Sequence, residues 1–174
     1  MSKVFVDTEF HENGTTIDLI SIGAVREDGE EFYAISEEFD LKAAWRVQWL
    51  RENVLSHLPL RPTRAWPGYL LDWESPIIQS RKLISKEFLA FAGPSPEFYG
   101  YYADYDWVAV CQLYGRMIDL PDGWPMYCRD LKQMLDDRGL TKEALGVEEP
   151  KNEHNALADA HFNLQLYEAL AMKE

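Results

Sequence analysis

The sequence is poor in cysteine and in basic residues, and it contains no long apolar run. Its two cysteines, Cys111 and Cys128, form no CxxC pair and are too few for a disulfide framework. This scarcity predicts a reduced, cytoplasmic setting. No apolar run approaches the roughly 20 residues of a membrane span, and the first residues lack the apolar core of a signal peptide. We therefore expect no membrane partner.

Positive charge is also scarce, because 17 lysine and arginine residues face 30 aspartate and glutamate residues, which gives a formal net charge of −13. Proteins that coat nucleic acid with their whole surface need a basic footprint, so the composition argues against that class. It leaves open an enzyme that meets phosphate groups through divalent cations held by carboxylates. With 174 residues, of which 47% are hydrophobic, the chain suits one folded domain.

Apolar periodicity and turn residues predict a mixed α/β organisation. Residues 3–10 alternate as a strand, with Asp7 and Glu9 on the same face. Two more strands follow after short turns, at 16–25 and 31–35, which predicts an antiparallel meander. Further strands are expected at 97–102 and 126–128, and helices at 75–91, 106–114, 130–137 and 156–172. The first of these helices should begin at Ser75, with Pro76 in its first position.

The segment from about residue 40 to 90 differs in charge from the rest of the chain. It begins with a helical pattern over 41–58 and continues with a proline-punctuated stretch. Between residues 42 and 86, eight basic and three acidic residues give a local charge of +5, and five aromatic residues are interleaved with them: Trp45, Trp49, Trp66, Tyr69 and Trp73. This composition suits a single-stranded backbone with stacked bases. A solvated basic face, or a subunit interface rich in Trp and Arg, explains it equally well.

Three short motifs carry the candidate chemistry, and each taken alone has an ordinary structural explanation. Asp7 and Glu9 are neighbours on one strand face, where acidic pairs are commonly solvated. Asp106 opens a helix, a position that the helix dipole favours. His154 and Asp159 lie where a loop enters the last helix. The combination points further, because carboxylates placed side by side repel one another unless a cation such as a divalent metal lies between them.

The order of these motifs resembles that of the DEDD exonuclease superfamily, which has a ribonuclease-H-like fold. The matching segments are Val6-Asp7-Thr8-Glu9, Tyr105-Asp106 and His154 to Asp159, together with a second-strand segment from Leu19 to Val25. One branch carries a Tyr four residues before the last Asp, where this chain has Asn155. His154 lies five residues before Asp159, as is typical of the His branch, DEDDh. The resemblance spans residues 3 to about 170 and leaves about 40–90 without a counterpart.

This resemblance implies an α/β, ribonuclease-H-like fold. We expect a mixed five-stranded sheet, in which three antiparallel strands are followed by parallel strands, flanked by helices. The whole chain, residues 1–174, would form a single exonuclease domain with a basic and aromatic helical insert at about 40–90. Relatives in the DEDDh branch are often homodimers, so a homodimer is expected here as well.

The resemblance also implies a reaction, the metal-dependent 3′→5′ hydrolysis of a nucleic acid strand to nucleoside 5′-monophosphates. The predicted catalytic residues are Asp7, Glu9, Asp106, His154 and Asp159. The four carboxylates among them would hold two Mg²⁺ ions, or Mn²⁺, and His154 would act as general base. The segments Asp7–Phe10 and Tyr102–Trp107 most resemble the small exoribonucleases of mycobacterial type that trim RNA 3′ ends with a preference for adenylate. The expected partner is therefore a single-stranded RNA 3′ end.

The second motif departs from the family pattern at one position. Where the family usually has an Asn four residues before its Asp, this chain has Tyr102. Asp104 is a second acidic candidate nearby. Tyr105 matches the aromatic residue that normally precedes the catalytic Asp, which favours Asp106.

A second departure concerns the substrate. After Glu9 the chain has Phe10-His11-Glu12, at a position that helps to bind the terminal nucleotide in relatives. The predicted substrate-binding residues are Glu9, Phe10, His11, Arg61 and Arg64.

Two other functions are compatible with the same motifs. A DNA-directed DEDDh exonuclease for proofreading or repair would use the same site, and 2′-hydroxyl contacts distinguish the two substrates. A non-catalytic nucleic-acid-binding module would use the fold alone, although intact acidic motifs argue against it. A calcium-binding module is not expected, since no 12-residue loop has ligands at the required positions.

Overall fold

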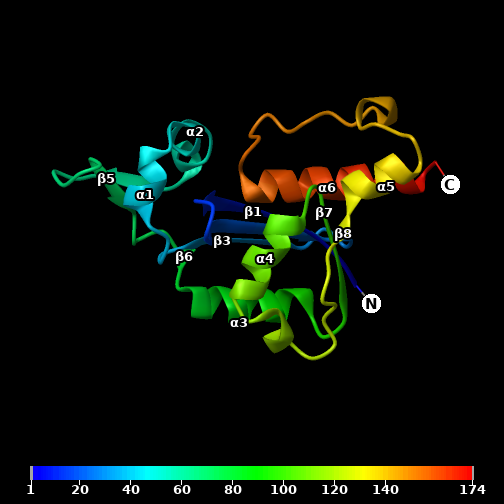
Figure 1. Cartoon of the computed structure of the whole chain (residues 1–174), viewed down its shortest axis with the longest axis horizontal. Coiled ribbons are helices and arrows are strands. Elements are labelled where there is room, and N and C mark those ends of the chain that lie inside the picture. The colour runs from blue at the N-terminus through cyan, green and yellow to red at the C-terminus, as the bar shows by residue number, and fades with distance from the viewer. Residues whose placement is uncertain (1, 174) are drawn as a thin grey trace.

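In the computed structural model, which describes residues 2–173, one mixed sheet of six strands forms the centre of the molecule (Figure 1). The strand order is β6-β3-β2-β1-β7-β8. β2 pairs with β1 and β3 in antiparallel fashion, whereas β7 is parallel to β1 and β8 is parallel to β7. The strands are β1 (Ser2–Glu12), β2 (Ile17–Arg26), β3 (Glu31–Ser36), β6 (Ile78–Gln79), β7 (Pro96–Gly100) and β8 (Arg129–Asp130).

This architecture is the α/β, ribonuclease-H-like arrangement expected from the sequence, with six strands in place of five. The additional strand is β6, whose Ile78 and Gln79 pair in parallel with the end of β3. Residues 75–79 therefore form a turn and a strand, and the expected helix start at Ser75 is wrong. Helix α3 (Arg81–Ala92) instead begins after Ser80, whose hydroxyl accepts a hydrogen bond from the Leu83 N–H at 3.3 Å.

The short strand expected at 126–128 also lies elsewhere. The strand in this region is β8, whose Arg129 and Asp130 pair with Tyr99 and Gly100 of β7. Asp130 also caps helix α5 (Leu131–Asp137), because its carboxylate accepts a hydrogen bond from the Gln133 N–H. Asp130 is thus both the last residue of β8 and the N-cap of α5. Its pairing with Gly100 of β7 sets where the strand ends.

Helices cover both faces of the sheet. Helix α6 (Ala156–Ala171) lies on one face, and α3 and α4 (Asp104–Gln112) lie on the other (Figure 1). β1 divides its side chains between the two resulting cores: Val4 and Val6 pack in the cluster with α3 and α4, whereas Phe5 packs in the cluster with α5 and α6. The alternation seen in the sequence therefore sends the two sets of side chains to opposite faces.

The start of α6 approaches β2 closely because residue 23 is a glycine. A Cβ atom on Gly23 would lie 2.2 Å from the backbone carbon of Ala156. Further along the helix, the buried side chain of Asn163 donates a hydrogen bond to the Val6 carbonyl at 3.1 Å. These two contacts fix the N-terminal half of α6 against the middle of the sheet.

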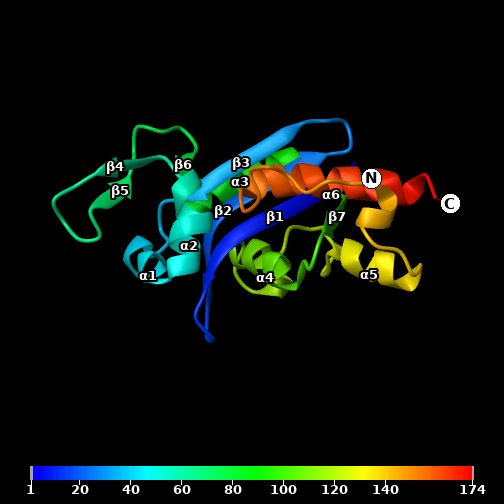
Figure 2. The same ribbon diagram turned by 90° about the horizontal axis from the view of Figure 1, so that it is seen from above.

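The insert at 40–90 is mixed rather than purely helical. It contains α1 (Leu41–Arg46), α2 (Gln48–Asn53), a 3₁₀ turn (Leu55–His57) and a separate two-stranded sheet of β4 (Leu60–Pro62) and β5 (Tyr69–Leu71). Figure 2 shows these elements at one end of the molecule and α5 at the other. Residues of α2 and the 3₁₀ turn pack on Ile20 and Ile35 of the main sheet. Over residues 2–173, no helix meets the length and apolarity that a membrane crossing requires.

Candidate active site

The first motif lies on β1, on the face of the sheet that α6 covers. Asp7 and Glu9 follow Phe5 with a period of two, so their side chains project toward the same side as that core residue. Glu9 is 8% exposed, and the register between β1 and β2 shifts between Glu9 and Phe10, after which the two strands continue to pair. Asp7 lines a cavity of about 300 Å³ together with His154 and Asp159.

The second motif approaches β1 from the opposite face, in the first turn of α4. One carboxylate oxygen of Asp106, Oδ1, accepts two hydrogen bonds from Thr8, at 2.8 Å from the backbone N–H and at 2.6 Å from the hydroxyl. Asp106 is 7% exposed, whereas the nearby Asp104 is exposed. Of the two acidic candidates, Asp106 is thus the one that contacts the strand of the first motif.

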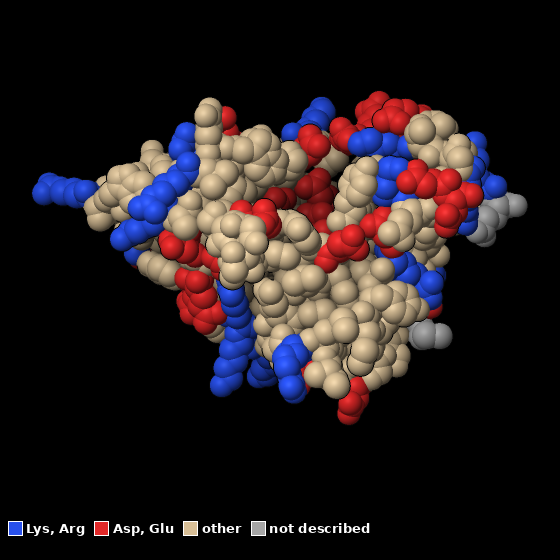
Figure 3. Space-filling view, in the orientation of Figure 1, with Lys and Arg blue, Asp and Glu red and all other residues tan. Residues whose placement is uncertain are grey.

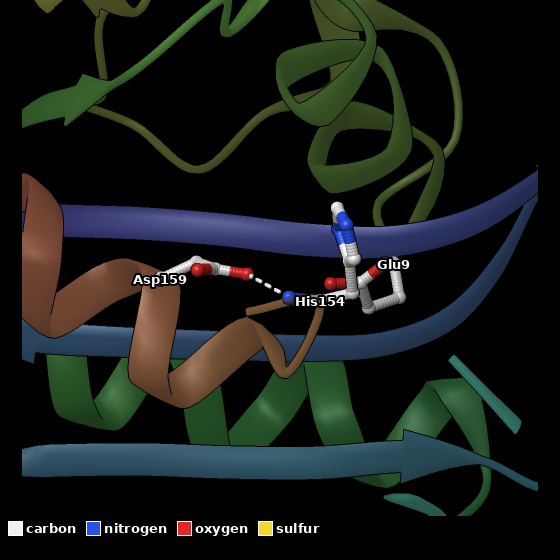
Figure 4. Close-up of side chains that lie close together, drawn as sticks. All are labelled: Glu9, His154 and Asp159. Atoms are coloured by element: carbon white, nitrogen blue, oxygen red, sulfur yellow. Dashed lines mark hydrogen bonds between the residues drawn. The ribbon is translucent and has the colours of Figure 1, made fainter. Parts of the chain in front are cut away.

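The third motif bends the chain into α6. The carboxylate of Asp159, Oδ2, accepts a hydrogen bond from the His154 backbone N–H at 2.9 Å, and the Asn155 side chain caps the helix by accepting from the Ala158 N–H. His154 has a φ of +66°, in the left-handed region that is unfavourable for a residue with a side chain. One ligand atom from each of Glu9, His154 and Asp159 lies within 4.8 Å of the others. Figure 4 shows the three residues side by side, with the hydrogen bond from the His154 backbone to Asp159 dashed.

Burial raises the pKa values of all four carboxyl groups, and repulsion within the cluster raises those of Asp7 and Glu9 further. The pKa of Asp7 is raised well above its ordinary value, first by burial and then by the carboxylates of Asp106, Glu9 and Asp159. Burial and repulsion from Asp159 and Asp106 raise the pKa of Glu9 to about 8. Burial raises the pKa of Asp106 and of Asp159 to about 6 each, although hydrogen bonds to their carboxylates oppose the rise. Nearby positive charge therefore does not offset the cost of ionising these four carboxyl groups.

Comparison with known proteins places the whole chain in one family. No model of a protein family matches the chain. Two proteins from strains of Mycobacterium tuberculosis, each named 3′-5′ exoribonuclease, are 40% identical to it over 166 residues. The match covers 95% of this chain and 90% of each relative. The chain belongs to this family of mycobacterial-type 3′-5′ exoribonucleases.

Membership of this exoribonuclease family also bears on the insert. The superfamily motifs assign no counterpart to segment 40–90. The match to the relatives covers 95% of the chain, so fewer residues lie outside the match than the insert contains. The matched stretch of 166 residues therefore extends across the insert.

The cavity of this family member is strongly acidic. Besides Asp7 and Asp159, it is lined by Glu149 and Glu153, and Figure 3 shows acidic side chains gathered in and around a hollow on the face viewed. Among the described residues that line the cavity, the basic side chains are Lys142 and His154, and Lys142 forms an ion pair with Glu149. The carboxylates of the site are thus left without a paired basic side chain in the cavity.

The structure distributes the predicted substrate-binding residues over three places. Phe10 lies beside the motifs, where its ring meets that of Tyr105 edge-on with centroids 5.9 Å apart. His11 lines a different pocket, with Asp18 and Arg81 among its other residues. Arg61 and Arg64 are exposed on the small sheet of the insert, in β4 and in the turn that follows it. Neither arginine is among the described residues that line the acidic cavity.

Two contacts of the site were not expected from the sequence. Thr8 binds Asp106 through both its backbone and its hydroxyl, and the pattern Asp-Thr-Glu held the only signal, a hydroxyl between two acidic residues. Trp49 of the insert meets the imidazole of His154, with ring centroids 4.7 Å apart. Nothing in the sequence pairs Trp49 with His154, because the insert and the last loop are far apart along the chain.

Proposed function

We propose that this chain is a metal-dependent 3′-5′ exoribonuclease that hydrolyses single-stranded RNA from its 3′ end and releases nucleoside 5′-monophosphates. The observation that carries the proposal is the convergence of three motifs, distant in sequence, around β1: Glu9, His154 and Asp159 offer ligand atoms within 4.8 Å, and Asp106 is bound to the same strand through Thr8. Family membership with proteins named 3′-5′ exoribonuclease supports the reaction and its direction.

The donor set fits divalent cations. Carboxylate oxygens are the ligands that Mg²⁺ and Mn²⁺ prefer. Four buried or partly buried carboxyl groups with raised pKa values, near a lysine that is already paired with Glu149, form a site that a doubly charged cation would stabilise. We propose two Mg²⁺ ions, replaceable by Mn²⁺, held by Asp7, Glu9, Asp106 and Asp159.

The proposed roles divide between metal binding and proton transfer. When bound, the two ions would supply charge stabilisation to the phosphate and to the departing 3′ oxygen. His154, whose ring borders the cavity, accepts a proton from the attacking water as the general base. Asp159 holds the His154 backbone through the 2.9 Å hydrogen bond, and Thr8 holds the Asp106 carboxylate. Both contacts orient groups that meet the substrate.

For the substrate, we propose that the 3′-terminal nucleotide lies at the end of β1, near Glu9 and Phe10. The upstream backbone would follow the basic insert at Arg61 and Arg64, which are exposed to solvent. Basic side chains beside aromatic rings suit a single strand. A preference for adenylate, as in the relatives that the motifs resemble, is part of the proposal.

The proposal is tested by incubating the protein with Mg²⁺ and end-labelled RNA homopolymers of the four bases and identifying the products. We expect shortening from the 3′ end, nucleoside 5′-monophosphates as products, fastest turnover of the adenylate polymer, and loss of activity with Asp7→Asn. A matched DNA oligonucleotide serves as the comparison. Preferred turnover of DNA would replace the RNA assignment, and full activity of Asp7→Asn would refute the site.

We also propose that the chain forms a homodimer, as the family resemblance implies. Large aromatic side chains of the insert, such as Trp66 and Trp73, are each 52% exposed in the single chain. Sedimentation equilibrium at micromolar concentration measures the mass directly. A single species of 20.2 kDa would refute the dimer without affecting the proposed reaction.

A further inference from the structure

Trp49, in helix α2 of the insert, lies against the imidazole of His154. The ring centroids are 4.7 Å apart and the ring planes meet at 69°, so that the edge of one ring faces the other. We propose that Trp49 is a positioning residue, which holds the His154 imidazole in the orientation that accepts a proton from the attacking water. The inference rests on the proposed role of His154 as general base.

The backbone of His154 is fixed, but its ring is not fixed by hydrogen bonds. A φ of +66° and the hydrogen bond from its N–H to Asp159 define where the Cβ atom lies. Within residues 2–173, no hydrogen bond to a ring nitrogen of His154 is formed, whereas catalytic and ligating histidines are commonly oriented by one. Among the described residues, the aromatic ring that packs against this imidazole is that of Trp49, and this contact is what limits rotation of the ring in our proposal.

Helix α2, which carries Trp49, is packed firmly against the main sheet. Its helix is anchored by Leu50, which is 6% exposed, and the following Val54 and Leu55 are almost completely buried against the main sheet. The side chain of Asn53 donates a hydrogen bond to the Trp49 carbonyl at 2.8 Å. Packing of helix α2 on the main sheet therefore fixes where Trp49 lies relative to the His154 ring.

Burial of apolar surface does not account for Trp49. Its side chain is 49% exposed, so it contributes little to the core beneath it. An exposed tryptophan that touches a catalytic imidazole has two possible roles at this place: it positions the ring, or it stacks on a base of the substrate. The edge-on contact with His154, already formed without RNA, favours positioning. Base stacking is the competing outcome of the test.

The test compares Trp49→Ala and Trp49→Phe with Gln48→Ala, a control that removes an exposed neighbouring side chain from the same helix. Steady-state kinetics on single-stranded RNA with Mg²⁺ give kcat and KM separately. We expect Trp49→Ala to lower kcat by about 10-fold or more with KM changed less than about 2-fold, because misplacing a catalytic group slows the chemical step. Trp49→Phe keeps an aromatic edge and should recover most of kcat, and Gln48→Ala should match the wild type.

A second readout needs neither metal nor turnover. The imidazole Cε1–H resonance of His154, assigned with His154→Gln, should shift in Trp49→Ala through loss of the ring current and remain close to the wild type in Trp49→Phe. RNA affinity, measured by fluorescence anisotropy in an Asp7→Asn background, should be the same with Trp49 and with Ala at position 49. Circular dichroism and thermal unfolding identify any variant that fails to fold, in which case Trp49→Phe and Trp49→His carry the comparison.

The outcomes separate this inference from the proposed function. If the wild type shortens RNA from its 3′ end but Trp49→Ala keeps its kcat, the positioning role is wrong and the function stands. A raised KM at unchanged kcat, with weaker RNA binding, would assign Trp49 to base stacking instead. If the wild type itself releases no nucleotide from RNA, the proposed function fails, and the positioning role fails with it even where the resonance shift confirms the contact.

Discussion

Thr8 binds one oxygen of Asp106 twice, with its backbone N–H at 2.8 Å and its hydroxyl at 2.6 Å, across 98 residues of sequence. Thr8 is 5% exposed, so both bonds lie out of contact with bulk water. They leave the other carboxylate oxygen of Asp106 unengaged by Thr8. The contact joins the first and second motifs and orients Asp106 before any substrate or cation arrives.

Replacing Thr8 with Val should weaken cation binding and turnover. Val keeps the shape but removes the hydroxyl donor, which leaves only the backbone bond to Asp106. Loss of a partner behind a metal ligand typically costs about 10- to 100-fold in metal affinity or activity. We expect a loss of about 10-fold in Mg²⁺ affinity by calorimetry, with a parallel loss of activity at limiting Mg²⁺. Thr8→Ser, which retains the hydroxyl, is the control, and equal behaviour of both variants would contradict the role.

The two acidic residues of the first α4 turn should differ sharply. Asp106 is buried and bound to Thr8, whereas Asp104 is exposed. Asp106→Asn should reduce kcat by about 100-fold or more on RNA, because removing one charged ligand removes stabilisation of the transition state. Asp104→Asn changes the same charge two residues away and should leave kcat nearly unchanged. The reverse order would assign the second motif to Asp104.

Without metal, stability should fall as pH rises. The ordinary pKa of Glu9 is 4.5, and in the folded chain it is about 8. Between these values the unfolded chain has released the Glu9 proton while the folded chain keeps it. The folded state then binds more protons, so the free energy of unfolding decreases from pH 4.5 toward pH 8. Asp106 and Asp159, whose pKa values are raised to about 6, act in the same direction at lower pH.

Urea unfolding in the presence of a chelator, at several pH values across this window, measures the slope. Glu9→Gln should flatten it above pH 6, since the amide does not titrate. Saturating Mg²⁺ should also flatten it, because a bound cation stabilises the ionised carboxylates of the folded state. A slope that is unchanged by both would show that Glu9 does not titrate in this environment.

Gly23→Ala should displace the start of α6. The added Cβ would lie 2.2 Å from the Ala156 backbone, so the helix must move away from β2. We expect a loss of about 3 kcal/mol in the free energy of unfolding, in the range of overpacked buried sites, together with reduced activity because Asp159 moves with the helix. Gly14→Ala, where a Cβ meets nothing within 4 Å but φ is +83°, should cost only about 1 kcal/mol. Equal losses would contradict the close approach.

The double variant of Arg61→Ala and Arg64→Ala tests the basic insert. If these arginines follow the RNA backbone, removing them should weaken binding and lower the slope of log affinity against log salt by about 1 to 2. Fluorescence anisotropy over a range of salt concentrations measures both. Arg116→Ala with Lys173→Ala removes the same charge from exposed positions outside the insert and is the control. Unchanged RNA binding would favour a subunit interface for the insert.

The sequence predicted elements well where local patterns were strong. The alternation of β1, the antiparallel meander and the last helix all follow from apolar periodicity and turn residues, and the structure confirms them. Its errors lie where pairing decides the outcome. Ser75-Pro76 is as good a local helix start as Ser80, but the segment between them pairs with β3 and forms β6. Two-residue strands such as β6 and β8 have no periodicity that a sequence can show.

The sequence by itself determined the chemistry of the candidate site, because the order and spacing of Asp7, Glu9, Asp106, His154 and Asp159 are properties of the chain alone. Only the tertiary structure decided how those groups are held. Which side chain orients Asp106 and which ring meets His154 depend on strand pairing and on the seating of the insert against the sheet. Such contacts join segments distant in sequence, where local propensity carries no information and the packing of the whole chain selects the neighbours.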